Sequence, residues 1–347
     1  MKFLSRFCVI FYCAGISFLG YQINCAKPNA VNEHSEIRSL SPEFITIYVH
    51  GTTTKVGLKL LSKFCKDVTF GKPGVHHFDE LPEISLLLKD AKTLQNCDNR
   101  RFDCNHFYTF GWSGSLSFKA REKAGKELYD GTVKLLSEYQ KKYGKIPKLR
   151  IWTFSHGGNV ALNMVKLLPF FENQPVHLEL LLVAVPVQKV TEKLIEHPCI
   201  TQSYVISSTR DLMQVLDTYK FEKKRYTPAR FFDTTASNCR QIKVLINNRG
   251  LGHADLLRSF TLHLPGALNF ADQVYPTKIA LLPEVFGGKN QKTEKPEIIE
   301  YAIQDPGFRF FKFLNLKQCV RGKRKKCTVK NTPKRLIKSA LSSNLIP

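Results

Sequence analysis

Three residues of the kinds needed for nucleophilic acyl transfer each follow a hydrophobic segment of the chain. They are Ser155, Asp211 and His253, in that order. A serine hydroxyl is a weak nucleophile by itself, so a neighbouring imidazole must take its proton. A carboxylate must then orient that imidazole and stabilise its cation. The three residue types in this order therefore point to hydrolysis or transfer of an acyl group.

The setting of the serine is the most specific of these signals. The segment RIWTFSHGGNVAL (150–162) runs from a hydrophobic strand through a Ser-His-Gly-Gly corner into an apolar helix. The usual catalytic form of such a corner is G-x-S-x-G, and Thr153 stands where the first Gly is expected. Threonine is β-branched and larger than glycine, so the corner needs more room there. We expect Thr153 to be tolerated, because Gly157 and Gly158 still leave room on the side of the corner where the helix passes close to the strand.

Along the chain, short apolar runs alternate with amphipathic stretches. The predicted strands are 43–51, 106–114, 148–154, 176–186, 202–208 and 240–248, and the predicted helices are 117–144 and 158–171. Several of the strands are apolar almost throughout, as expected for strands covered on both faces. Alternating strands and helices predict the α/β class, with a mostly parallel sheet flanked by helices on both faces.

Ligands bind beyond the carboxyl ends of the strands in parallel sheets. Besides the serine, the acid and the histidine already named, these ends carry His50-Gly51-Thr52 and Trp112. We interpret His50 as a buried residue that shapes its loop rather than as a proton carrier. Trp112 is interpreted as part of the wall or the core, bordering the acyl pocket.

Four segments resemble the α/β-hydrolase fold, and the resemblance covers roughly residues 44–265. FSHGGNVAL resembles the nucleophile elbow of that family's lipases and esterases, and VHGTT resembles its oxyanion loop. SSTRD resembles the segment that holds the acid, and NNRGLGHADLL resembles the loop that holds the histidine. The resemblance implies an α/β-hydrolase domain over 40–287, with 67–105 as a candidate insertion and 212–239 as a candidate cap.

The resemblance also assigns roles to single residues. Ser155 is then the nucleophile, His253 the base and Asp211 the orienting acid. The backbone N–H groups of Thr52 and His156 would bind the oxyanion. Asp217, six residues after Asp211, is an alternative acid; the position directly after the strand favours Asp211.

The N-terminus has the composition of an export signal. A basic start, with Lys2 and Arg6, precedes an apolar run from Phe7 to about Leu19, which is short for a membrane span. We therefore expect residues 1–26 to act as an export signal, with an uncleaved N-terminal anchor as the alternative. The protein is expected to be secreted, periplasmic or membrane-associated.

The net charge of +23 is concentrated toward the other end of the chain. From Lys289 to Pro347 there are fifteen Lys and Arg residues against four acidic ones. This basic C-terminal tail (288–347) suggests contact with an anionic surface. Together with the export signal, the absence of interleaved aromatic residues in its segment CVRGKRKKCTVKNTPKR favours lipid headgroups over nucleic acid. A solvated tail without a partner is the alternative.

Seven of the ten cysteines lie after the N-terminal segment. In an exported chain, Cys97–Cys104 and Cys319–Cys327 are plausible local bridges. Neither pair has the spacing of a zinc site, so we expect no structural metal and no cofactor.

These observations together predict an exported serine hydrolase that cleaves carboxylic esters, with lipid-like esters as substrates, through an acyl-enzyme on Ser155. Thioesterase or amidase activity is an alternative. So is a catalytically inactive binding module, because the same fold serves both purposes.

Overall fold

A computed structural model of the chain describes residues 42–52, 72–81, 85–168, 176–216, 229–279, 297–308 and 310. These residues all belong to one compact unit, which ends at Lys312. The predicted export signal or anchor (1–26) and most of the predicted basic tail (288–347) lie outside the described residues.

The described residues form a mixed, mostly parallel sheet of nine strands with helices, which places the protein in the α/β class. The strands are β1 (Phe44–Val49), β2 (Gly74–His77), β3 (Phe107–Gly111), β4 (Lys148–Phe154), β5 (Leu178–Val183), β6 (Ile200–Ser207), β7 (Cys239–Ile246), β8 (Arg249–Gly250) and β9 (Ile298–Ile303). The α-helices are α3 (Leu86–Cys97), α4 (Phe118–Tyr143), α5 (Gly157–Val165), α6 (Lys189–Glu192), α7 (Met213–Leu216), α8 (His253–Arg258) and α9 (Leu264–Ile279). Short 3-10 turns are η2 (Phe78–Glu80), η3 (Cys104–His106), η5 (Lys193–Glu196) and η7 (Thr261–His263).

The order of the strands is β2-β3-β1-β4-β5-β6-β7-β8, and β9 also pairs with β7. The pairs from β3 through β7 are parallel, as is the β7–β9 pair. Only the short outer pairs β2–β3 and β7–β8 are antiparallel within the described part of the chain. The carboxyl ends of β1, β3, β4, β5, β6 and β7 therefore meet at one edge of the sheet.

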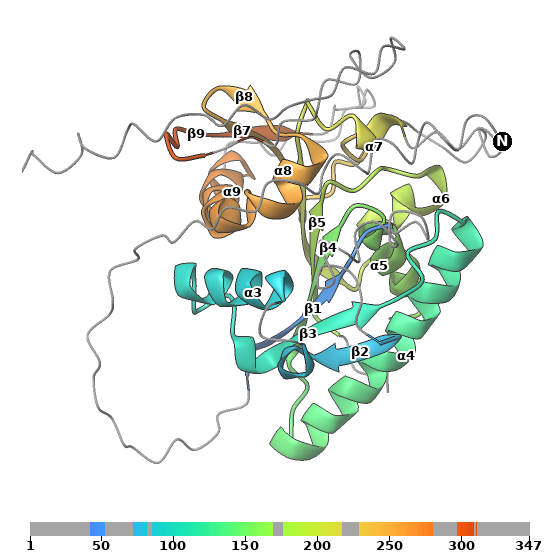
Figure 1. Ribbon diagram of the computed structural model, residues 1–347. Helices are drawn as coiled ribbons and strands as arrows, with labels where there is room; N and C mark the ends of the chain where they lie inside the picture. The colour runs from blue at the N-terminus through green and yellow to red at the C-terminus, as the bar shows by residue number, and fades with distance from the viewer. Residues whose placement is uncertain are drawn as a thin grey trace, which may run out of the picture. The chain divides into compact units, whose positions relative to one another are not determined.

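Helices cover both faces of the sheet, with α4 and α5 on one side and α3 and α9 on the other (Figure 1). Alternate residues of each strand supply the two cores: Ile151 of β4 packs with α4 and α5, whereas Trp152 packs with α3 and α9. All six residues of β5 are buried, which explains why its sequence LELLLV is almost entirely apolar.

The structure confirms the predicted strands and helices to within a few residues of their ends. The predicted helix 117–144 is α4, which buries Leu128, Leu135 and Leu136 on one face. Gly144 ends it in the left-handed region, with φ of 72°, where glycine is favoured. The predicted helix 158–171 is shorter in its described part, because α5 ends at Val165.

Three strands at the edges of the sheet were not predicted: β2, β9 and the two-residue β8. The range 67–105, taken as an insertion, contains β2 and α3, and β2 extends the sheet beyond β3. Residues 298–303, taken as part of the basic tail, form β9 and extend the sheet beyond β7. Of the predicted cap 212–239, the structure describes α7 and the residues from 229 onward.

The cysteines of the described region carry no disulfide. Cys97, at the end of α3, and Cys104, in η3, are thiols, so the predicted bridge between them is not formed. The backbone N–H of Cys104 donates to Gln95 Oε1, at 2.8 Å. The second predicted pair, Cys319 and Cys327, lies outside the described residues. Within the described ranges, no helix is both long and apolar enough to cross a membrane.

Candidate active site at the carboxyl ends of the strands

Ser155 occupies a sharp corner between β4 and α5, and its backbone lies in the left-handed region with φ of 53°. This conformation is uncommon for residues other than glycine and costs about 1–2 kcal/mol. Two hydrogen bonds hold it: Ser155 N–H donates to the Val183 carbonyl at 2.9 Å, and Gly158 N–H donates to the Ser155 carbonyl at 3.0 Å. A strained residue that its surroundings hold in place is typical of a functional site.

The two glycines after the corner let α5 begin close to the neighbouring strands. A Cβ on Gly157 would lie 2.3 Å from the Val49 carbonyl oxygen, and one on Gly158 would lie 2.3 Å from Val185 Cγ2. Both distances are far below van der Waals contact. A larger residue at Gly157 would meet backbone and push the helix away from the sheet, whereas one at Gly158 would meet the side chain of Val185. Gly157 is therefore needed for this corner to form.

Thr153, the departure from the usual pattern, is accommodated in the sheet. Its side chain is fully buried, and its Oγ1 donates a hydrogen bond to the Leu181 carbonyl on β5, at 3.1 Å. The hydroxyl thus has a partner, which removes the penalty for burying it. The left-handed corner at Ser155 forms in the presence of Thr153, so a glycine at this position is not required for the turn.

Asp211 and His253 come together from two separate loops. Asp211 follows β6, His253 begins α8, and His253 Nδ1 lies 2.8 Å from Asp211 Oδ2. Asp211 is completely buried, and its other oxygen, Oδ1, accepts from the N–H groups of Met213 (3.0 Å) and Gln214 (3.4 Å). The carboxylate is therefore fixed in orientation, and it can hold the imidazole with the Nδ1 proton directed toward it.

The loop that carries His253 is attached to the segment that carries the acid, because Leu251 N–H donates to Ser208 Oγ at 2.6 Å. Within the His253 segment, Gly252 N–H donates to Asp255 Oδ2 at 2.8 Å. The His253 ring packs against the Phe154 ring, with 4.6 Å between centroids. Because Phe154 directly precedes Ser155, this contact places the imidazole beside the corner.

In the described part of the chain, no hydrogen bond joins Ser155 Oγ to His253. Such hydrogen bonds are often long before a substrate binds and shorten in the complex. What the structure brings together is the Asp211–His253 pair and, beside it, the strained corner that presents Ser155. Asp217, the alternative acid, lies outside the described residues.

The loop after β1 passes directly against the serine. A Cβ on Gly51 would lie 2.8 Å from Ser155 Cβ, so only glycine fits at this point. His50, the residue before it, is buried as predicted. Burial lowers the pKa of His50 from its usual 6.5 to about 4, so the ring is neutral near pH 7.

A tryptophan fixes the tautomer and the position of this histidine. The Trp112 backbone N–H donates to His50 Nε2 at 3.4 Å, so the ring proton lies on Nδ1, which donates to the Gly51 carbonyl at 2.7 Å. The Trp112 indole N–H donates to the His50 carbonyl at 2.9 Å, and the two rings stack. The sequence indicated Trp112 only as wall or core; this contact with His50 was missed, because the two residues are 62 positions apart.

Each of the two expected oxyanion donors directly follows a residue of the corner or of the loop packed against it. Thr52 follows Gly51, whose Cα lies against Ser155, and His156 follows Ser155 and precedes the first residue of α5. Since the Gly51 carbonyl is bound by the His50 ring, the Gly51–Thr52 peptide is fixed and its N–H points the opposite way. Ala184, unnoticed in the sequence, lies beside Ser155 at the end of β5 with φ of 56°.

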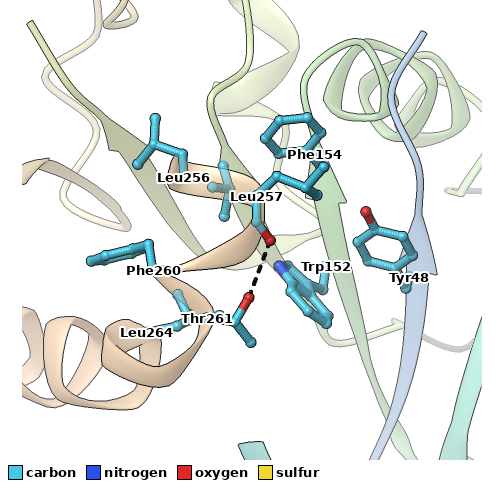
Figure 2. A pocket seen from close by; sticks show the side chains of 9 residues that line it. Tyr48, Trp152, Phe154, Leu256, Leu257, Phe260, Thr261 and Leu264 are labelled. Carbon is cyan, nitrogen blue, oxygen red and sulfur yellow. Dashed lines mark hydrogen bonds between the residues drawn. The ribbon is translucent and has the colours of Figure 1, made fainter. Parts of the chain in front are cut away.

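A small, mostly apolar pocket lies between the sheet and α8. Figure 2 shows Tyr48, Trp152 and Phe154 from the sheet facing Leu256 and Leu257 of α8. A hydrogen bond of 3.3 Å from Thr261 Oγ1 to the Leu257 carbonyl closes the turn after the helix. Since Phe154 also contacts His253, this packing determines where α8 presents the imidazole.

The described residues contain no group of three or more His, Cys, Asp and Glu side chains that could hold a metal ion. Comparison with known proteins adds no assignment: no family model matches the chain, and no curated protein matches it significantly.

Proposed function

We propose that the protein is an exported serine hydrolase of the α/β-hydrolase type that cleaves carboxylic esters, with lipid-like esters as substrates. The observation that carries this proposal is the buried, hydrogen-bonded Asp211–His253 pair beside a serine held at φ of 53°. The order of the three residues along the chain, and their places after β4, β6 and β8, are those expected for this type of enzyme.

The proposed reaction uses each of these groups. Ser155 Oγ attacks the ester carbonyl carbon while His253 Nε2 accepts its proton, and the carbonyl electron pair moves to the oxygen. The N–H groups of Thr52 and His156 donate to that oxyanion. His253 then protonates the leaving alkoxide, and the C–O bond breaks. Water, activated by the same base, hydrolyses the acyl-enzyme and frees Ser155.

Asp211 stabilises the imidazolium that forms at both stages. Its carboxylate is buried and bound on Oδ1 by two backbone N–H groups, so it needs no reorganisation when the charge develops on His253. The neutral His50 contributes by holding the oxyanion loop rather than by transferring protons.

The preference for lipid-like esters and the exported location rest on the sequence. The basic tail and the apolar N-terminal run are consistent with an enzyme that works at an anionic membrane surface. A series of p-nitrophenyl esters of increasing chain length would measure the preference directly. A liposome-pelleting assay in which binding does not depend on anionic lipid would contradict the membrane contact.

The proposal is tested with a fluorophosphonate probe, which reacts with activated serines. We expect it to label the purified protein and to leave Ser155→Ala unlabelled. Ser117→Ala is a matched control, because Ser117 is exposed and its side chain makes no capping hydrogen bond. A folded wild-type protein that stays unlabelled would overturn the proposal and favour a binding module instead.

A further inference from the structure

The loop that follows β1 holds a buried hydroxyl group whose hydrogen-bonding capacity is unused. Thr52 Oγ1 is shielded from solvent and has no hydrogen-bond partner among the described residues. Leaving such a group unpaired costs about 1–3 kcal/mol. Three other buried threonine hydroxyls are paired: Thr153 donates to Leu181, Thr191 donates to Asn159, and Thr261 donates to Leu257. The unpaired hydroxyl of Thr52 therefore needs an explanation.

The position of Thr52 supplies an explanation for its unpaired hydroxyl. Its neighbour Gly51 lies so close to the serine that a Cβ there would be 2.8 Å from Ser155 Cβ and 3.1 Å from the Phe154 carbonyl. The loop is also held against the start of α5, since a Cβ on Gly157 would lie 2.7 Å from the His50 carbonyl oxygen. The first residue beyond this contact is Thr52, so its buried hydroxyl belongs to the loop that packs against Ser155.

The neighbouring carbonyls of the loop already have donors: those of His50 and Gly51 accept from Trp112 Nε1 and from the His50 ring. A donor that is buried and unpaired in the ground state is well suited to a negative charge that appears only in the transition state.

We propose that the Thr52 side chain is a catalytic residue, whose hydroxyl donates a third hydrogen bond to the oxyanion formed when Ser155 attacks the ester carbonyl. This inference rests on the proposed hydrolase function. The hydroxyl keeps its proton throughout, while the carbonyl π pair moves to the oxygen and returns when the alkoxide leaves. One residue then supplies two donors, its backbone N–H and its side chain.

The test compares Thr52→Val, which is nearly isosteric but lacks the hydroxyl, with Thr52→Ser, which keeps it. With p-nitrophenyl butyrate, we expect Thr52→Val to lower kcat by about 10²-fold with little change in KM. Thr52→Ser should restore most of the rate. The rate of fluorophosphonate labelling should fall in parallel, because phosphonylation also develops charge on oxygen.

A matched control is Thr132→Val, since Thr132 is fully buried on α4 and its hydroxyl contacts only Met164 Sδ, at 3.9 Å, among the described residues. This variant should keep the wild-type kcat. If Thr52→Val keeps kcat within about twofold, or if Thr52→Ser is as slow as Thr52→Val, the inference is wrong while the hydrolase proposal stands. If the folded wild type neither hydrolyses esters nor reacts with the probe, the hydrolase proposal fails, and this inference fails with it.

Discussion

His253 Nδ1 and Asp211 Oδ2 lie 2.8 Å apart, although 42 residues separate them in the chain. The carboxylate is fully buried and receives two backbone N–H groups on its other oxygen. This arrangement favours one tautomer of the imidazole, with the ring proton on Nδ1 and Nε2 free of it, as the proposed role of His253 as a base requires.

Asp211→Asn should therefore lower kcat for ester hydrolysis by about 10⁴-fold, because the amide can present its NH₂ group and hold the wrong tautomer. Steady-state kinetics with a p-nitrophenyl ester measures the loss. Asp305→Asn is a matched control, since Asp305 pairs with His263 at 3.1 Å across the same sequence separation. Asp217→Asn should also retain activity. Loss of activity on Asp217→Asn alone would transfer the role of the acid to that residue.

Thr153→Gly should lower stability without abolishing the activated serine. The change removes a buried side chain and its hydrogen bond to the Leu181 carbonyl and adds a flexible residue to β4, so we expect a loss of about 2–3 kcal/mol in the free energy of unfolding. Urea denaturation measures this loss. Labelling of Ser155 at more than the wild-type rate would show, against our expectation, that Thr153 obstructs the corner.

Gly157→Ala should be more damaging than Gly158→Ala. At Gly157 the new methyl group would meet the backbone oxygens of Val49 and His50, whereas at Gly158 it meets the side chain of Val185, which can change its rotamer. We expect a loss of more than about 2 kcal/mol for Gly157→Ala, with reduced labelling of the serine, because the loop that carries His50 and Thr52 must move.

Gly144→Ala measures the cost of backbone strain alone, for comparison with Gly157→Ala and Gly158→Ala. Gly144 has φ of 72° and nothing within 4 Å of its Cβ position, so alanine there should cost about 1 kcal/mol and leave activity unchanged. Thermal or urea unfolding of the three variants gives the ranking. Equal losses at positions 144 and 157 would mean that the close contact with the loop does not constrain the corner.

The buried, neutral His50 should make stability depend on pH. Its pKa is about 4 in the folded protein and near 6.5 when unfolded, so between these values the unfolded chain binds the extra proton. The free energy of unfolding should therefore fall as pH decreases from about 6.5 to 4, by about 3 kcal/mol over the window. Above pH 6.5 this contribution is fully present.

His50→Gln should remove this contribution, and the measurement is the difference between wild type and variant in urea unfolding at several pH values. The difference is needed because Asp90 acts in the opposite direction. Burial raises the pKa of Asp90 to about 7, although Arg258 partly counters the effect, so its contribution falls as pH rises from about 4 to 7. If the free energies of unfolding of wild type and variant differ by the same amount from pH 4 to 6.5, His50 is not held neutral.

Much of the framework could be predicted from local sequence. The central strands and α4 were predicted because burial on both faces of a sheet, or on one face of a helix, leaves a hydrophobic pattern within a single segment. The corner at Ser155 was predicted for a similar reason, since its glycines are needed where the helix crowds the strand. The edge strands β2, β8 and β9 were missed. An edge strand is held by backbone hydrogen bonds to one neighbour, and GVHH has no apolar alternation to reveal it.

The sequence by itself determined which residue types follow which strands and the order in which they come. Only the tertiary structure decided that Asp211 meets His253, that Trp112 holds His50 across 62 residues, and that Gly51 lies against Ser155. It also left Cys97 and Cys104 as thiols despite their short spacing. The reason is physical: hydrophobic periodicity is a property of one segment, whereas a distance between side chains on different loops depends on the register of every strand between them.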